Sequence, residues 1–118
     1  MPRIGFQLEP ATNIPTMVSW LEKYGGGVQK FYCDKRFRIT FDPPGAWTGV
    51  GRIPGGGGGA TWVNKDEYDS GPPGAGQAEI WLRINNNPPS PGALGYKFKV
   101  EIFDGGWSNP WDPRVIPD

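Results

Sequence analysis

Two stretches decide the fold, AEIWLRI at 78–84 and YKFKVEIF at 96–103. In the first, the apolar positions Ile80, Leu82 and Ile84 alternate with Glu79, Trp81 and Arg83. In the second, Tyr96, Phe98, Val100 and Ile102 alternate with Lys97, Lys99 and Glu101. A period of two places apolar side chains on one face of a β-strand and polar side chains on the other. Strands with a single apolar face predict two sheets that pack around a common core.

Shorter stretches elsewhere in the chain predict more strands. The candidates are RIGFQLE at 3–9, VQKFYC at 28–33, KRFRITF at 35–41, ATWV at 60–63 and the tail at 111–118. TMVSWLEKY at 16–24 fits a strand or a short helix, and we favour a strand because so short a helix is marginal. Turn signals stand at 42–45 and 104–106, and loops are expected at 47–59, 64–76 and 85–95. No stretch predicts a helix with more weight than a strand.

The composition agrees with a folded chain of many turns. Gly and Pro account for 19 and 14 of the 118 residues, but 14% of the residues are aromatic. So many aromatic residues are atypical of a disordered chain. Gly and Pro also cluster between the apolar stretches, where turns are expected. We therefore expect one all-β domain over residues 1–118, an antiparallel two-sheet sandwich with long Gly- and Pro-rich loops.

Three short motifs carry a resemblance: V-S-W at 18–20, Y-K-F-K-V at 96–100 and W-D-P-R-V-I at 111–116. With them the chain resembles the cupredoxin-like Greek-key sandwiches over about half its length, and an immunoglobulin-like sandwich is the alternative. The resemblance implies a copper site made of two His, a Cys and usually a Met. This chain has no His, and Cys33 lies far from the closing strand, so a type 1 copper site is excluded. We expect the scaffold without metal or cofactor.

Composition also limits the other functions. The absence of His excludes Ser-His-Asp and Cys-His catalytic centres, and a single Cys excludes an internal disulfide. The glycine run at 49–59 lacks the Lys-Ser/Thr of a phosphate-binding loop. The acidic stretch Asn64, Asp66, Glu67 and Asp69 is an incomplete calcium loop.

Lys+Arg and Asp+Glu balance at 12 each, so neither a nucleic acid nor a membrane is an expected partner. No signal-peptide pattern opens the chain, which favours a cytoplasmic protein.

The aromatic residues are the candidates for binding. Trp81 and Phe103 fall on the outward face of their strands, and Trp47, Trp107 and Trp111 lie in or beside loops. Exposed aromatic side chains anchor protein interfaces or stack on sugars. We therefore expect a non-catalytic binding module whose partner is a protein or a second copy of the chain. The alternative is a lectin-like module that binds carbohydrate through exposed Trp.

Overall fold

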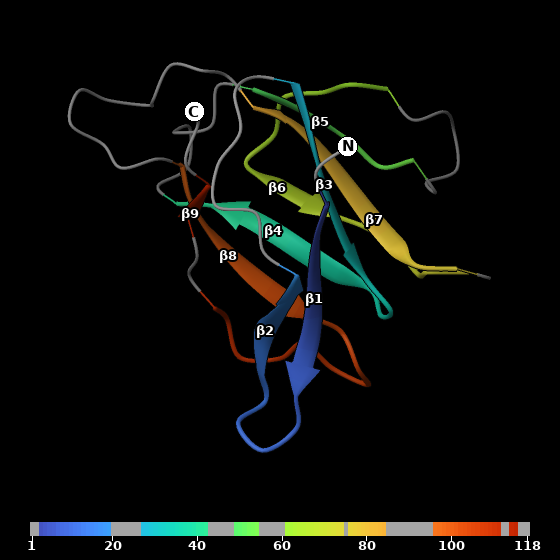
Figure 1. Ribbon diagram of the computed structural model, residues 1–118, viewed down its shortest axis with the longest axis vertical. Coiled ribbons are helices and arrows are strands. Elements are labelled where there is room, and N and C mark those ends of the chain that lie inside the picture. The colour runs from blue at the N-terminus through green and yellow to red at the C-terminus, as the bar shows by residue number, and fades with distance from the viewer. Residues whose placement is uncertain are drawn as a thin grey trace.

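The computed structural model describes residues 3–19, 27–42, 49–54, 61–74, 76–84, 96–111 and 114–115. These residues form nine strands and no helix, so none of them belongs to a helix able to cross a membrane. The strands lie in two sheets that pack against each other (Figure 1). The expected all-β, two-sheet architecture is therefore confirmed.

The larger sheet has five strands in the order β2-β1-β3-β7-β5. Its strands are β1 (Arg3–Glu9), β2 (Ile14–Ser19), β3 (Gly27–Cys33), β5 (Val50–Arg52) and β7 (Ala78–Ile84). β1 and β3 are parallel, whereas the other pairs are antiparallel. The expectation of a fully antiparallel sandwich is wrong for this pair. β2 folds back along one edge of β1, and β3 then lies along the other edge in the direction of β1. Hydrophobic alternation carries no information about strand direction.

The smaller sheet is antiparallel and has the order β6-β4-β8-β9. Its strands are β4 (Phe37–Phe41), β6 (Glu67–Asp69), β8 (Tyr96–Ile102) and the two-residue β9 (Arg114–Val115). From β3 to β8, each successive strand lies in the opposite sheet. The chain therefore crosses the core repeatedly, and loops gather at the two ends of the sandwich.

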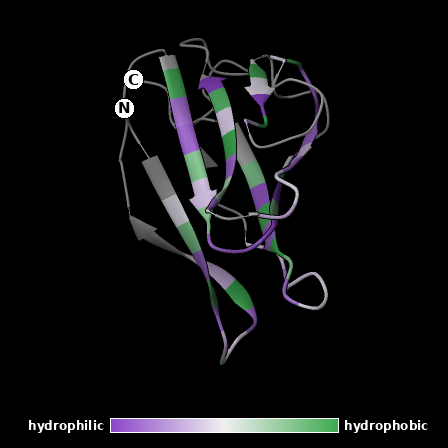
Figure 2. Ribbon diagram, turned by 90° about the vertical axis from the view of Figure 1, so that its right-hand side faces the viewer, coloured by the Kyte–Doolittle hydropathy of each residue, from purple (hydrophilic) through white to green (hydrophobic). Residues whose placement is uncertain are grey.

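Both sheets contribute to one core, rich in aromatic rings. Figure 2 shows the alternation along the strands as bands of hydrophobic and hydrophilic colour. The buried apolar residues are Phe6, Phe31, Cys33, Phe37, Ile39, Phe41, Tyr68, Ala78, Ile80, Leu82, Phe98, Val100 and Ile102. Phe31 of β3 meets Phe98 of β8 edge to face, with ring centroids 5.7 Å apart. The predicted inward faces of 78–84 and 96–103 are confirmed wherever their side chains are described.

Several strand boundaries differ from the expectation. The strand predicted at 16–24 is confirmed as far as Ser19 but begins at Ile14, and 20–24 lie outside the described residues. β5 lies inside the predicted loop at 47–59, and β6 lies inside the predicted loop at 64–76. Both strands have three residues, too few to show an alternating pattern. The strand expected at 60–63 is reduced, among its described residues, to a single bridge between Val63 and Gly51.

The two missed strands meet at Gly51, which leaves room for the ring of Tyr68. A Cβ atom built on Gly51 would lie 2.3 Å from Cε1 of Tyr68. The Tyr68 hydroxyl donates to the Val63 carbonyl at 2.6 Å and accepts from the Lys65 amide at 2.9 Å. Only glycine therefore fits at position 51, where the backbone of β5 in one sheet packs against the Tyr68 ring of β6 in the other.

Candidate binding site

The aromatic candidates fall at separate places in the fold. Phe103 and Trp107 come together at the end of β8, and Trp81 lies on the outer face of the larger sheet. Trp111 packs against the core, with its ring 6.3 Å from that of Phe6 and its backbone bridged to Val100. Trp47 lies outside the described residues. Among the candidates that the structure describes, only Phe103 and Trp107 therefore share a site.

A tight turn holds Phe103 and Trp107 side by side. The two residues form a β-bridge across 104–106, where Gly105 has a φ of 76° that favours glycine. Their ring centroids are 5.2 Å apart, and the rings meet edge to face. The predicted turn at 104–106 and the outward position of Phe103 are confirmed, since Phe103 is 36% exposed. A large apolar side chain is thus presented at one end of the sandwich.

Two arginines before and within β4 cover Trp107. The guanidinium carbons of Arg36 and Arg38 lie 5.1 and 4.0 Å from the ring centroid of Trp107. Nε and Nη2 of Arg38 each donate to the Glu101 carboxylate at 2.9 Å. Arg36 grips Asp69 in the same two-pronged way, and these hydrogen bonds hold the pKa of Asp69 below its usual value. The charges of Arg36 and Arg38 are therefore neutralised by carboxylates of the same chain rather than left for an anionic polymer.

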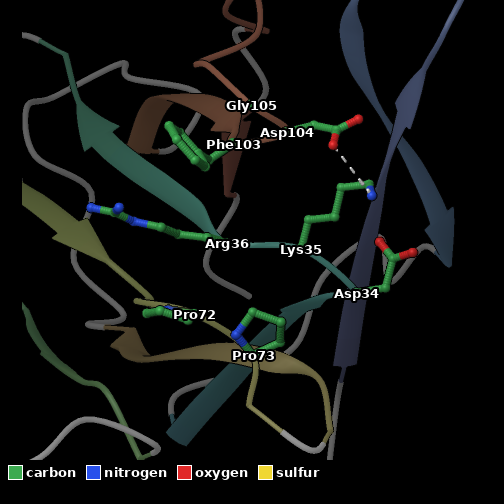
Figure 3. Close-up of a pocket in the computed structure, with 8 residues that line it drawn as sticks. All are labelled: Asp34, Lys35, Arg36, Pro72, Pro73, Phe103, Asp104 and Gly105. Atoms are coloured by element: carbon green, nitrogen blue, oxygen red, sulfur yellow. Dashed lines mark ion pairs between the residues drawn. The ribbon is translucent and has the colours of Figure 1, made fainter.

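A groove opens beside Phe103 (Figure 3), with a volume of about 340 Å³. It is lined by Asp34, Lys35, Arg36, Pro72, Pro73, Phe103, Asp104 and Gly105. These residues come from the β3–β4 connection, the segment after β6 and the turn after β8. In Figure 3, the Phe103 ring and the two proline rings lie on opposite sides of the Arg36 side chain. The groove therefore combines apolar walls with a charged rim, where Lys35 pairs with Asp104 at 3.6 Å.

Sequence reasoning found only part of this site. The alternation along β8 located Phe103, and the Asp-Gly-Gly signal located the turn. The prolines stood in a stretch that was predicted only as a loop. The ion pairs of Arg36 and Arg38 could not be predicted, because their carboxylate partners lie 33 and 63 residues away along the chain. Those distant partners leave no mark on local sequence patterns.

The incomplete calcium loop does not assemble a metal site in the described part of the chain. Asp69 is held by Arg36, and Glu67 accepts a hydrogen bond from Thr40 and lies 3.8 Å from Arg38. The described residues contain no group of three potential metal ligands among His, Cys, Asp and Glu. Glu67 and Asp69 thus serve as counter-ions to the arginines Arg38 and Arg36.

Cys33 is buried at the end of β3, where it pairs with Ala78 of β7. Desolvation by burial raises the pKa of the thiol to about 11. Because only the thiolate is nucleophilic, the raised pKa and the burial of the sulfur both slow its reactions at neutral pH. It also lies on a different strand from β8, where the resemblance would require a copper ligand.

We expect the native protein to react with a thiol-specific disulfide reagent at pH 8 on the order of 100-fold more slowly than the unfolded chain. The raised pKa makes the thiolate scarce, and burial blocks access to the sulfur. The measurement is the release of the reporter thiolate over time, with and without denaturant. Equal rates in the two conditions would show that Cys33 is exposed.

Comparison of the chain with protein-family models, with curated proteins and with solved structures gives no match.

Proposed function

We propose that this chain is a non-catalytic protein-binding module on a cupredoxin-like Greek-key scaffold, with its site in the groove beside Phe103. The observation that carries the proposal is the exposure of Phe103 above a groove built from three loops at one end of the sandwich. Loops positioned by a rigid scaffold are common binding sites. An aromatic side chain beside a pocket is the usual anchor of a protein interface.

The strand arrangement supports the scaffold part of the proposal. Immunoglobulin-type sandwiches consist of antiparallel sheets, whereas the larger sheet here contains the parallel pair β1 and β3. Successive strands from β3 to β8 cross between sheets, as long Greek-key connections do. The chain contains no His, so the scaffold would be used without the copper of the family that it resembles.

Two observations favour a protein over a carbohydrate ligand. Sugar rings stack on an open aromatic face, but Arg36 and Arg38 already lie over Trp107. The groove walls include two prolines and Phe103, which suit an apolar side chain inserted from a partner. Because Arg36 and Arg38 cover Trp107, the alternative of a carbohydrate bound through exposed Trp would have to use the Phe103 ring instead, and the Arg36 guanidinium carbon lies 5.4 Å from that ring as well. The Asp34 and Asp104 carboxylates would accept hydrogen bonds from hydroxyl groups.

Paired selections from a displayed random-peptide library test the proposal. The baits are the wild-type protein and the Phe103→Ser variant. Val63→Ser is the matched control, because Val63 is equally exposed at 37% but lies on another part of the surface. We expect peptides that are enriched on the wild type and on Val63→Ser but not on Phe103→Ser.

A glycan array and sedimentation of the same three proteins separate the alternatives. Concentration-dependent association that Phe103→Ser abolishes would identify a second copy of the chain as the partner. Phe103-dependent glycan binding without any peptide enrichment would instead establish the lectin-like alternative and overturn the proposal.

A further inference from the structure

The outer face of the larger sheet carries a second group of side chains, here named the cation–aromatic patch: Lys30, Arg52, Trp62, Trp81 and Arg83. Strand register places Lys30 of β3, Trp81 of β7 and Arg52 of β5 in one row across three strands. Lys30 Nζ and the Arg52 guanidinium carbon lie 4.0 and 5.1 Å from the Trp81 ring centroid. The guanidinium carbon of Arg83 lies 4.6 Å from the Trp62 ring.

The outward orientation predicted for Trp81 is thus correct, but its neighbours were not foreseen. Cationic side chains from the two adjacent strands lie against the indole, which leaves it half-buried. Such cation–π contacts stabilise an aromatic ring that would otherwise face water. They do not supply an acceptor for the N–H groups of the same side chains.

An arginine of the smaller sheet that also stacks on a tryptophan has a carboxylate partner, which Arg52 does not have within the described part of the chain. Arg38 stacks on Trp107 and also donates Nε and Nη2 to the Glu101 carboxylate. Arg52 stacks on Trp81, but its Nε is buried without an acceptor among the described residues. Trp81 Nε1 is also buried, and it too has no hydrogen-bond acceptor among the residues that the structure describes. The carboxylates that pair with Lys35, Arg36 and Arg38 belong to Asp104, Asp69, Glu67 and Glu101, none of which lies in the patch.

We infer that the cation–aromatic patch binds an extended acidic segment of a protein partner, whose carboxylates pair with the Lys30 ammonium and the Arg52 guanidinium. Arg52 Nε itself is buried, so an incoming carboxylate would meet the terminal Nη groups of the guanidinium, and hydrogen bonds between charged groups are the strong ones. The surface is distinct from the Phe103 groove, so the inference does not depend on the proposed function.

Spacing within the sheet fits such a segment. Lys30 and Arg52 are separated by two inter-strand distances, about 9.6 Å. In a segment with the polyproline II conformation, residues three apart lie on the same face and are separated by about 9.3 Å. Acidic side chains at every third position would therefore meet Lys30 and Arg52 together. Single-stranded nucleic acid fits less well, because it needs open aromatic faces, and the rings of Trp81 and Trp62 already contact cations.

The probe is a labelled peptide of glutamates separated by pairs of glycines, titrated at low salt and followed by fluorescence anisotropy. We expect saturable binding that Arg52→Gln weakens roughly 10-fold or more, because hydrogen bonds to a charged group are lost. Lys99→Gln removes the same charge from the smaller sheet and is expected to change the affinity less than about 2-fold. Phe103→Ser should leave this binding unchanged.

A spectroscopic measurement checks the site independently of the Arg52 variant. The indole N–H resonance of Trp81, assigned with Trp81→Phe, should shift as the peptide is added. The matching glutamine peptide and an oligothymidylate are the comparison ligands. The inference is overturned by the absence of saturable peptide binding, by equal weakening in Arg52→Gln and Lys99→Gln, or by tighter binding of the oligothymidylate.

Discussion

Phe98→Ala is expected to lower the free energy of unfolding by about 3–5 kcal/mol, through lost transfer energy and the cavity left behind. Phe98 is 1% exposed on β8. Its ring lies 5.7 Å from that of Phe31 in the opposite sheet and 6.0 Å from that of Phe41 in its own sheet. A typical domain is stable by about 5–15 kcal/mol, so this loss endangers folding.

Chemical denaturation of the wild type and the variant measures the effect. Lys99→Ala is the control, since the next residue on β8 faces outward and its truncation should cost less than about 0.5 kcal/mol. Leu82, fully buried on β7, belongs to the same core as Phe98 and should respond to truncation in the same direction. Similar losses from Phe98→Ala and Lys99→Ala would mean that the register of β8 is wrong.

Gly51→Ala is the second substitution with a large expected effect, about 2–3 kcal/mol of destabilisation from overpacking. The new methyl group would lie 2.3 Å from Cε1 of Tyr68. The ring cannot retreat without loss of its hydroxyl hydrogen bonds to Val63 and Lys65. The clash would therefore strain the contact between the two sheets, and movement of a flexible side chain could not relieve it.

A double-mutant cycle with Tyr68→Ala isolates the contact. In the Tyr68→Ala background, Gly51→Ala should cost far less, with a coupling energy of about 1–3 kcal/mol. Gly76→Ala is the control, because a Cβ atom there meets no atom within 4 Å. Additive free energies in the cycle, from denaturant melts of the four proteins, would refute the close packing of Gly51 and Tyr68.

The pattern of the sequence predicts the long strands clearly but gives little sign of the short ones. Alternation located β1, β7 and β8, because seven residues repeat the pattern often enough to be seen. β6 has one apolar residue, Tyr68, between two acids, and β5 is centred on Gly51. What fixes these strands is their contact with each other and with distant strands, and local patterns do not record such contacts.

The candidate surfaces were predictable to the same extent. Alternation gave the outward faces of Trp81 and Phe103, because that property is local. The cations beside Trp81 come from β3 and from β5, the strand hidden in a Gly-rich stretch. The groove beside Phe103 needs three loops that only the assembled sheets bring together. Single residues were therefore identified, but not the sites that they form.

The most direct test of the proposed function is the affinity of one wild-type-selected peptide for the wild type, Phe103→Ser and Val63→Ser. If Phe103 anchors the interface, Phe103→Ser should weaken binding about 30-fold, which corresponds to about 2 kcal/mol, with its thermal melt little changed. Val63→Ser should bind within about 2-fold of the wild type, as expected for a residue outside the interface. Equal affinity for all three proteins would contradict a binding site in the groove beside Phe103.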